Sequence, residues 1–448
     1  MDVLDTTCED HGHPSPQPNT TTHVNTPAPT IHPDLISQTI INSVKQRGSE
    51  SYRRSYNKWS STALERIQTQ LSQSLPVAPD ADATAQLGFE LGVAADYGQM
   101  PSFGNGGARA GYALDYFCRV KLLGDVLFGE RMNAWRREQQ QQLLQQQQNQ
   151  SSAVHVPSYL GDTITDLLCN PNNREVCRIG SLGGGPGFDH VAATVLATHA
   201  ALEREVQYCI DTNAGASFPN DEEESDSLPR LDVEDVLSHL SSRTTPPMPR
   251  IETTVYEYEA GWDDIIPYME QSTQSVLDLG SAQHHSCRFA GCDITLPLTH
   301  DANAQCYQQA QSTDLWICSY CVAENAVRLR ANDYVFFVEL FEAAQEGAVF
   351  VFTETTHRLW PEIIDVATKA NRENGSQIAG TGFDVAFPRI QRGRGKAGFQ
   401  LALRKASGAT LGEDVQATCE RFRRDNAMHE LKIRGGYKRQ KRKIRGAK

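Results

Sequence analysis

The sequence predicts an α/β fold in which a largely parallel sheet is covered by helices on both faces. The first observation is an apolar run over 176–182, typical of a buried strand, that leads directly into the turn Gly183-Gly-Gly-Pro-Gly187. The second is a set of apolar residues at helical spacing from Val191 to Leu202. The third is the alternation of strand-like and helical patterns along the rest of the chain, which closes with a predicted hairpin.

Length and composition narrow the class of protein. A chain of 448 residues is expected to form one or two domains with a full hydrophobic core. No apolar run approaches the roughly 20 residues of a membrane span, and the N-terminus lacks the basic-then-apolar pattern of a signal peptide. Eleven cysteines without a secretory context indicate reduced thiols inside a cell. We therefore expect a protein that contacts no membrane, and we expect it to be a monomer.

The first third of the chain is predicted to lie outside the sheet. Residues 1–33 are rich in Thr, Pro and His, which predicts disorder. Residues 34–135 predict a helical N-terminal subdomain that packs over the mouth of the main domain. Next to its glycine loop, Arg109 and Tyr112 are candidates for substrate contact, although such a loop is more often a connector. Residues 136–156 predict a solvated, glutamine-rich linker.

The glycine turn is a candidate site for a nucleotide-like ligand. Glycine permits positive φ and close approach of a ligand to the backbone, and a helix N-terminus offers free N–H groups. The dinucleotide fingerprint Gly-x-Gly-x-x-Gly fails, because its third glycine falls on Phe188. The glycines in phase are instead Gly183, Gly185 and Gly187. Taken alone, the turn also fits a tight connection that binds nothing.

A second strand follows an acidic insertion. Residues 213–250 predict a surface insertion with one short amphipathic piece at 231–240. The strand over 251–259 contains two acidic residues, Glu257 and Glu259, near its end. A carboxylate at the end of the second strand of a nucleotide-binding sheet accepts hydrogen bonds from ribose hydroxyls. We prefer Glu257 for that role, since one of the two faces solvent.

The remaining strands complete a main domain over 157–406. A third apolar run, 287–293, ends in Asp293 and is followed by Ile294. A fourth strand over 314–320 leads into Cys321-Val-Ala-Glu-Asn325, and a fifth covers 348–353. Two further runs, 383–387 and 399–403, predict the closing hairpin.

These features resemble the class I S-adenosylmethionine-dependent methyltransferases. The glycine turn resembles motif I of that family, the run ending in Asp293 and Ile294 resembles motif III, and the fourth strand resembles motif IV. The resemblance covers about 157–406 without the insertion. It implies a seven-stranded methyltransferase sheet with helices on both faces, and S-adenosylmethionine as the cofactor.

The resemblance also implies roles for individual residues. Gly183, Gly185 and Gly187 would lie against the cofactor, Asp293 would accept a hydrogen bond from the adenine amino group, and Ile294 would pack on the ring. The sequence departs from the family at Ser181, because many members carry an acidic residue two positions before the first glycine. Another group is then needed to hold the methionine ammonium.

Polar residues at the end of the fourth strand are candidates for the chemistry. Ser319 is a candidate cofactor contact, and Tyr320 and Glu324 are candidates to orient or deprotonate the methyl acceptor. Asn325 follows Glu324 in the sequence and is expected at the same end of the fourth strand. An equally plausible role for Glu324 is to cap or salt-bridge the helix that follows.

The cysteines near these strands do not predict zinc. Cys287, Cys292 and Cys318 fall inside predicted strands, where cysteine behaves as a small buried hydrophobe, and we expect no metal. Cys318 and Cys321 lack the Pro-Cys or Thr-Cys-Ser signature of pyrimidine C5 methylation, and the Asn/Asp-Pro-Pro-aromatic motif of adenine amino methylation is absent.

Charge is distributed unevenly between the ends of the chain. Residues 381–448 hold 18 Lys and Arg against 6 Asp and Glu, whereas the rest holds 24 against 49. This balance predicts a polyanionic partner at the C-terminal end. The candidate phosphate contacts lie beside the hairpin and in the basic tail over 407–448: Arg389, Arg392, Arg394, Lys396, Lys438, Arg439, Lys441, Arg442 and Lys443.

The sequence therefore predicts a methyltransferase that acts on RNA, with ribosomal RNA as one candidate substrate. Residues 432–448 are typical of a nucleic-acid-binding arm or a nuclear or nucleolar import signal, and the alternative location is the cytoplasm. Two other functions stay open. One is methylation of a small molecule or a protein, and the other is a non-catalytic RNA-binding protein that keeps the fold.

Overall fold

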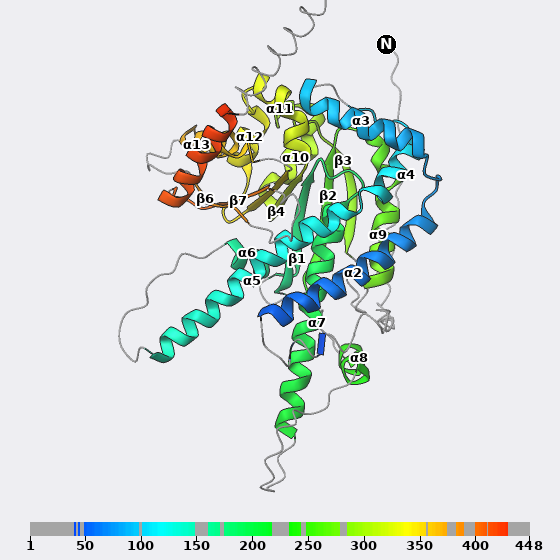
Figure 1. The fold of residues 1–448 in the computed structure, drawn as a ribbon, viewed down its shortest axis with the longest axis vertical. Helices are drawn as coiled ribbons and strands as arrows, with labels where there is room; N and C mark the ends of the chain where they lie inside the picture. Colours follow the sequence, from blue (N-terminus) through cyan, green and yellow to red (C-terminus); the bar gives the residue numbers. More distant parts are fainter. Residues whose placement is uncertain are drawn as a thin grey trace, which may run out of the picture.

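The computed structural model describes residues 40–41, 44, 49–97, 101–147, 160–170, 174–216, 233–242, 248–277, 285–354, 357–373, 382–388, 399–409 and 411–428. Within these ranges the chain forms one seven-stranded sheet with helices packed on both faces (Figure 1). No helix in the described ranges combines the length and the apolar character that crossing a membrane requires.

The sheet has the strand order β3-β2-β1-β4-β5-β7-β6. The first five strands in the chain are parallel to one another, and β7 is antiparallel to both β5 and β6. The order and the reversed last strand confirm the predicted methyltransferase sheet and its closing hairpin. The strands are β1 (Val176–Leu182), β2 (Arg250–Glu257), β3 (Ser286–Gly291), β4 (Leu315–Ser319), β5 (Val349–Glu354), β6 (Phe383–Ala386) and β7 (Phe399–Lys405).

Alternate residues of the central strands supply two separate cores, because successive side chains in a strand point to opposite faces. Leu315 and Ile317 of β4 belong to the core on one face, and Trp316 and Cys318 belong to the core on the other. The first core includes residues of α2 (Ser49–Ser74), α5 (Cys118–Gln147), α6 (Leu160–Cys169), α7 (Phe188–Ala216), α8 (Val233–Ser242) and α9 (Ile266–Leu277). The second includes residues of α10 (Ala304–Gln309), α11 (Cys321–Ala331), α12 (Val335–Ala343) and α13 (Trp360–Glu373).

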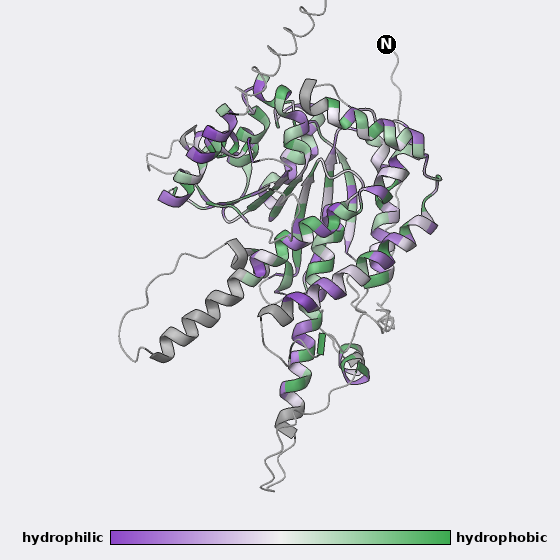
Figure 2. Cartoon of the chain, viewed as in Figure 1, coloured by the Kyte–Doolittle hydropathy of each residue, from purple (hydrophilic) through white to green (hydrophobic). Residues whose placement is uncertain are grey.

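Two N-terminal helices, α2 and α5, pack on the outer side of α7. Both α2 and α5 contact α7, and the Arg131 side chain of α5 forms a 2.7 Å ion pair with buried Glu203 of α7. Because α7 is covered by the sheet and by these helices, its residues 189–203 are buried around most of the helix. In Figure 2 the surface helices show both green and purple residues, as expected for helices with one buried side.

Two shorter N-terminal helices reach the edge of the sheet where the parallel strands end. These are α3 (Ala81–Tyr97), which contacts α11, and α4 (Gly106–Asp115), which contacts the 3-10 turn Ala260–Asp264 that follows β2 (Figure 1). Of the helical N-terminal part of the chain, α3 and α4 thus lie over the mouth of the sheet, while α2 and most of α5 pack on one of its faces against α7.

The structure differs from the prediction in the glutamine-rich segment. Helix α5 continues through the predicted linker as far as Gln147, which is consistent with the good helix propensity of glutamine. The short amphipathic piece predicted at 231–240 is α8, and the rest of the acidic insertion lies mostly outside the described residues.

The region predicted as a basic tail contains a helix over 413–428. Val415, Cys419 and Phe422 recur at helical spacing and are buried in the second core. On the outside of this helix, Arg423 Nη2 lies 2.8 Å from Asp365 Oδ1 of α13. The high charge of the segment hides this apolar stripe in the sequence.

Candidate active site

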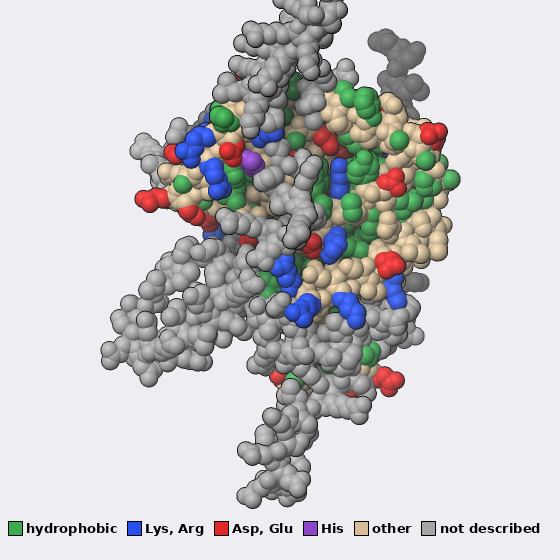
Figure 3. All heavy atoms as spheres, viewed as in Figure 1, with side chains coloured by type: hydrophobic (Ala, Val, Ile, Leu, Met, Phe, Trp, Pro, Cys, Tyr) green, Lys and Arg blue, Asp and Glu red, His purple; other side chains and the backbone are tan. Residues whose placement is uncertain are grey.

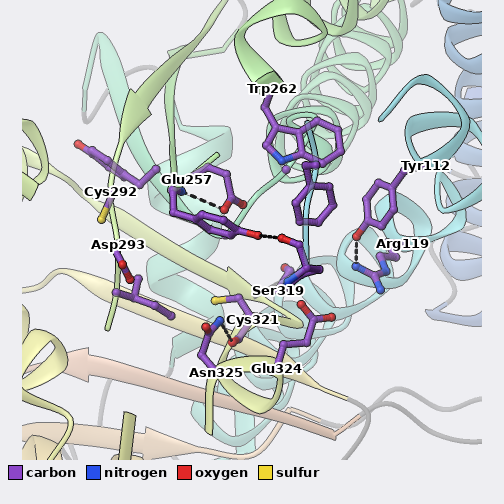
Figure 4. A pocket seen from close by; sticks show the side chains of 17 residues that line it. Tyr112, Arg119, Glu257, Trp262, Cys292, Asp293, Ser319, Cys321, Glu324 and Asn325 are labelled. Carbon is purple, nitrogen blue, oxygen red and sulfur yellow. Dashed lines mark hydrogen bonds between the residues drawn. The ribbon is translucent and has the colours of Figure 1, made fainter. Parts of the chain in front are cut away.

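The candidate site lies at the carboxyl ends of the strands, where the strand order reverses. Strand β1 pairs with β2 on one side and with β4 on the other, so the connections leaving β1 and β4 run in opposite directions. In open α/β sheets, ligands bind in the crevice that this reversal creates. A hollow of about 640 Å³, counting its open mouth, is found there (Figure 4).

The glycine turn forms one wall of the hollow. Gly183 and Gly185 have left-handed φ of +63° and +52° and line the hollow, as predicted for a ligand that lies against the backbone. Gly187 also has a positive φ, of +93°, but it packs against Cys287 of β3 and is not among the residues that line the hollow. The turn is fixed from below, because the Gly183 N–H donates to the Tyr256 carbonyl at 2.9 Å.

The ends of β2 and β3 bring two predicted carboxylates to the opposite wall. Glu257, the last residue of β2, lines the hollow, and burial raises the pKa of its carboxyl to about 7. Asp293 follows β3, and its Oδ1 accepts from the Thr295 N–H at 2.9 Å and from the Thr295 hydroxyl at 2.6 Å. Ile294 is buried and also lines the hollow. The less favoured Glu259 instead caps the following 3-10 turn.

A buried asparagine that the sequence did not single out holds the Asp293 loop. Asn303 Oδ1 accepts from the Asp293 N–H at 2.7 Å, and Asn303 Nδ2 donates to the carbonyls of Asp293 and Pro297 at 3.0 and 2.8 Å. Asn303 is fully buried, so these bonds fix the position of the loop beneath the hollow.

The N-terminal helices supply a roof. Pro101 and Phe103, before α4, and Tyr112, on α4, line the hollow together with Trp262 from the turn after β2. The indole N–H of Trp262 is buried and has no hydrogen-bond partner among the described residues. A wall of aromatic rings with a few polar groups is typical of a pocket for a small organic ligand.

Arg109 anchors this roof and does not line the hollow. Its guanidinium is ion-paired with Asp264, with Nε 3.3 Å from Oδ1, and it also donates to the Phe103 carbonyl. A Cβ atom on Gly261 would lie 2.5 Å from Arg109 Nη1, so the guanidinium packs directly on this glycine. Of the two candidates for substrate contact beside the glycine loop, the structure therefore brings Tyr112 to the site, and Arg109 has a positioning role.

The end of β4 forms the floor. Three of the four residues predicted at this strand end, Ser319, Glu324 and Asn325, line the hollow, together with Cys321. Burial raises the pKa of the Glu324 carboxyl to about 8, and nearby Arg119 acts in the opposite direction. Glu324 forms no ion pair within 4.0 Å among the described residues. The salt-bridge role considered for it is therefore not seen.

Of the other two candidates at the end of β4, Tyr320 lies outside the hollow and Asn325 lines it. Tyr320 adopts a left-handed φ of 64° where α11 begins, and its ring lies against the Arg119 guanidinium, with 4.5 Å between Cζ and the ring centroid. It is not among the residues that line the hollow. The Asn325 side chain donates to the Cys321 carbonyl at 2.7 Å and so stabilises the first turn of α11.

The two cysteines of the C-x-x-C are buried thiols. Cys318 Sγ and Cys321 Sγ lie 2.9 Å apart, and burial raises the pKa of the Cys318 thiol. The contact with Cys318 and burial together raise the pKa of the Cys321 thiol. A thiol held protonated is a poor nucleophile. Within the described ranges, no three His, Cys, Asp or Glu residues cluster closely enough to hold a metal ion.

A carboxylate lies beside Ser181, the residue that departs from the family pattern. Asp189, in the first turn of α7, accepts a hydrogen bond from the Ser181 hydroxyl at 2.7 Å and another from the Ser319 hydroxyl at 3.0 Å. Asp189 is 1% exposed, and burial raises the pKa of its carboxyl to about 6. The helix that follows β1 thus brings an acidic group to the end of that strand.

Arg119 is a further polar residue of the site that the sequence did not reveal. It belongs to α5, and Figure 4 shows it beside Tyr112, to whose hydroxyl it donates a hydrogen bond. The rings of Tyr112, Tyr116 and Tyr320 lie 5.4, 4.9 and 4.5 Å from its Cζ atom. Nothing in the local sequence distinguishes Arg119 from the other basic residues of this helix.

The predicted RNA-contacting residues lie outside the described residues. These are Arg389, Arg392, Arg394 and Lys396 near the hairpin, and Lys438, Arg439, Lys441, Arg442 and Lys443 in the tail. On the face seen in Figure 3, the coloured Lys and Arg side chains are interspersed with Asp and Glu.

Comparisons with known proteins return solved methyltransferase structures. No family model and no curated protein matches the chain. A precorrin-6y C5,15-methyltransferase from Geobacter metallireducens is similar at 8% identity and a TM-score of 0.27, covering 57% of this chain and 94% of that one. An S-adenosylmethionine-dependent methyltransferase from Methanosarcina mazei is similar at 10% identity and a TM-score of 0.26, covering 56% and 99%. The assignment of the class I methyltransferase fold rests on the strand order and the reversed β7.

Proposed function

We propose that this chain, which has the class I methyltransferase fold, binds S-adenosylmethionine and transfers its methyl group. The observation that carries the proposal is the hollow at the strand reversal, which has the left-handed glycine turn on one wall and Glu257 and Asp293 on the other. Methyl transfer needs all of these groups at one site, whether the acceptor is RNA, a small molecule or a protein. A non-catalytic RNA-binding protein does not need them.

The residues present fit this cofactor. The Glu257 carboxyl at the end of β2 is placed to accept hydrogen bonds from ribose hydroxyls, and Asp293 with Ile294 is placed for the adenine ring. Asp293 Oδ1 is already used by Thr295, so Oδ2 is the oxygen for the adenine amino group. Gly183 and Gly185 present bare backbone to the hollow, and a Cβ on Gly185 would point toward Trp262 and Tyr112 of the roof.

The protein contributes positioning and proton transfer to the proposed reaction. The bound cofactor supplies an electrophilic methyl group on a positively charged sulfonium. The Asp189 carboxyl, with a pKa of about 6, is mainly ionised at pH 7 and favours binding of a cation, whereas the Glu324 carboxyl, with a pKa of about 8, is mainly protonated. Phe103, Tyr112 and Trp262 exclude water from the roof, and Glu324 accepts the proton that the methylated atom releases.

We further propose that the acceptor is RNA. The support is the charge of residues 381–448, with 18 Lys and Arg against 6 Asp and Glu, and the nine basic and no acidic residues of 432–448. A basic arm binds nucleic acid through its phosphates, and the same segment has the composition of a nuclear import signal. We accordingly propose a monomeric protein of the nucleus or nucleolus.

Removal of residues 432–448 tests the RNA proposal. The truncated protein is expected to bind total RNA more weakly, with the slope of log K against log salt reduced by about 0.7 for each phosphate that the arm no longer neutralises. Filter binding between about 50 and 200 mM salt measures both quantities. Cofactor binding should stay unchanged, because the residues that line the hollow all lie between 101 and 325. An unchanged affinity and slope would contradict the RNA proposal and favour a small-molecule or protein acceptor.

A further inference from the structure

Two oppositely charged side chains face a second hollow directly over the glycine turn. It has a volume of about 310 Å³, counting its open mouth, and its lining includes Gly183, Gly185, Asp189, Arg119 and Ser319. Gly183, Gly185, Ser319 and Arg119 also line the larger hollow described above, so the two are neighbours around the turn. A ligand whose adenosine lies between Glu257 and Asp293 would therefore extend its other end toward Asp189 and Arg119.

We propose that Asp189 and Arg119 hold the charged amino-acid end of the cofactor, with Asp189 on the ammonium group and Arg119 on the carboxylate. This inference rests on the proposed function. It assigns to a helix residue, eight positions further along the chain, the role that the missing acidic residue at position 181 would have in the family.

Asp189 is a buried carboxylate whose oxygens have acceptor sites left for a cationic ligand. Its two oxygens accept one hydrogen bond each, from Ser181 and Ser319, and a carboxylate has about four acceptor sites. No Lys, Arg or His nitrogen among the described residues lies within 4.0 Å of it. A buried carboxylate without a cation is costly, and an ammonium group in the hollow would remove that cost.

Arg119 is a guanidinium with N–H donors left for an anionic ligand. The guanidinium has five N–H donors, and the structure shows one hydrogen bond from it, to the Tyr112 hydroxyl. Three tyrosine rings lie within 5.4 Å of its Cζ atom, and no described carboxylate lies within 4.0 Å of the guanidinium. A planar guanidinium held in this way suits a carboxylate, which it can bind through two parallel hydrogen bonds.

A purely structural role for Asp189 makes a different prediction. An acidic residue in the first turn of a helix is common, because it interacts favourably with the helix N-terminus. In that case its substitution would lower the stability of the fold and affect every ligand of the site equally. Ligands that differ only at the amino-acid end therefore separate the two roles.

The test is calorimetric titration of the full chain with two ligands. S-adenosylhomocysteine carries the amino-acid end, and 5′-methylthioadenosine has the same adenosine and sulfur without it. Asp189→Asn keeps the shape and removes the charge; its amide oxygen can still accept from one serine hydroxyl, while its amide nitrogen would donate to the other serine oxygen. We expect this variant to bind S-adenosylhomocysteine at least tenfold more weakly and 5′-methylthioadenosine within twofold of wild type. In contrast, Asp293→Ala, at the adenosine end, should weaken both ligands.

Arg119→Gln tests the carboxylate half in the same way. It is expected to weaken S-adenosylhomocysteine at least tenfold, while the decarboxylated form of that ligand, which keeps the ammonium, binds the variant as it binds wild type. Arg119 would be a contact for the methyl acceptor instead if both ligands bound the variant like wild type, and that result would overturn its assignment.

The pH dependence gives a readout that folding does not change. Because the Asp189 carboxyl titrates near pH 6, wild-type affinity for S-adenosylhomocysteine should fall by up to tenfold per pH unit below about 6. The Glu257 carboxyl, with a pKa of about 7, would contact the ribose of both ligands, so the readout is the ratio of the two affinities: affinity for S-adenosylhomocysteine should fall below about pH 6 relative to that for 5′-methylthioadenosine. Ser181→Ala keeps the carboxylate but removes a hydrogen bond that lowers its pKa, so the decline should begin at a higher pH.

The outcomes distinguish this inference from the proposed function. If Asp189→Asn weakens both ligands equally, or neither, the assignment of Asp189 is wrong although the cofactor site stands. If wild type binds neither ligand, the proposed cofactor itself is wrong. Urea unfolding of Asp189→Asn checks that the variant is folded, and the Ser181→Ala pH shift tests Asp189 without removing it.

Discussion

Gly183→Ala is expected to destabilise the fold and abolish cofactor binding. An alanine at φ of +63° costs about 1–2 kcal/mol of backbone strain. In addition, its Cβ would lie 2.5 Å from Cys321 Cβ and 2.9 Å from Cys321 Sγ, and such overpacking costs roughly 1–3 kcal/mol. The turn would have to shift to relieve the overlap, and it lines both hollows.

Gly347→Ala is the matched control for this substitution. Gly347 has a left-handed φ of +83°, but a Cβ there would meet no atom within 4 Å. It carries the backbone strain without the steric overlap and lies away from the site. Urea unfolding should therefore show a loss of about 2–5 kcal/mol for Gly183→Ala and about 1–2 kcal/mol for the control. Equal losses would show that the contact with Cys321 does not constrain the turn.

Glu324→Gln is expected to lower methyl transfer by about 10²–10⁴-fold, the usual contribution of a positioned proton acceptor. The variant keeps the size of the side chain and removes its capacity to take a proton. The pKa of the Glu324 carboxyl is about 8, and only the ionised form accepts a proton. The kcat/KM of wild type should therefore rise up to about pH 8 and then level off, whereas the rise in the variant should already end near pH 7, where the Glu257 carboxyl titrates.

The pH profile is measured with S-adenosylmethionine as the varied substrate, because kcat/KM then reports groups of the free enzyme. Total RNA from cells that lack the protein serves as the acceptor, since it retains unmodified sites. Glu420→Gln, an exposed position on the helix over 413–428, controls for loss of one negative charge. A profile that is unchanged in Glu324→Gln would assign the rise to another group and leave Glu324 with a binding role at most.

The sequence predicted the parts of the site that follow strands directly. Strand β1 was predicted with its observed bounds, and Glu257 and Asp293 line the same hollow as the glycine turn because parallel strands end at the same edge of a sheet. These positions depend on local patterns and on one topological rule. The fold class was predicted for the same reason, since the alternation of strands and helices limits the possible connections.

The groups that the sequence did not reveal are set by tertiary packing. Arg119 is far from the strands in the chain, and it reaches the hollow only because α5 packs on α7. Asp189 directly follows the glycine turn, but an acidic residue in the first turn of a helix has an ordinary explanation. Its environment between two serine hydroxyls, one from β1 and one from β4, exists only once the strands are paired.

The most direct test of the cofactor site is calorimetric titration of S-adenosylhomocysteine into wild type and Asp293→Ala. The account predicts micromolar binding to wild type, which corresponds to about −8 kcal/mol, and loss of binding in the variant. Circular dichroism would confirm that the variant is folded, since Asp293 also bonds Thr295. Absence of binding to wild type would contradict the proposed methyltransferase and favour a non-catalytic protein with this fold. Equal binding to both proteins would place the ligand outside the hollow described here.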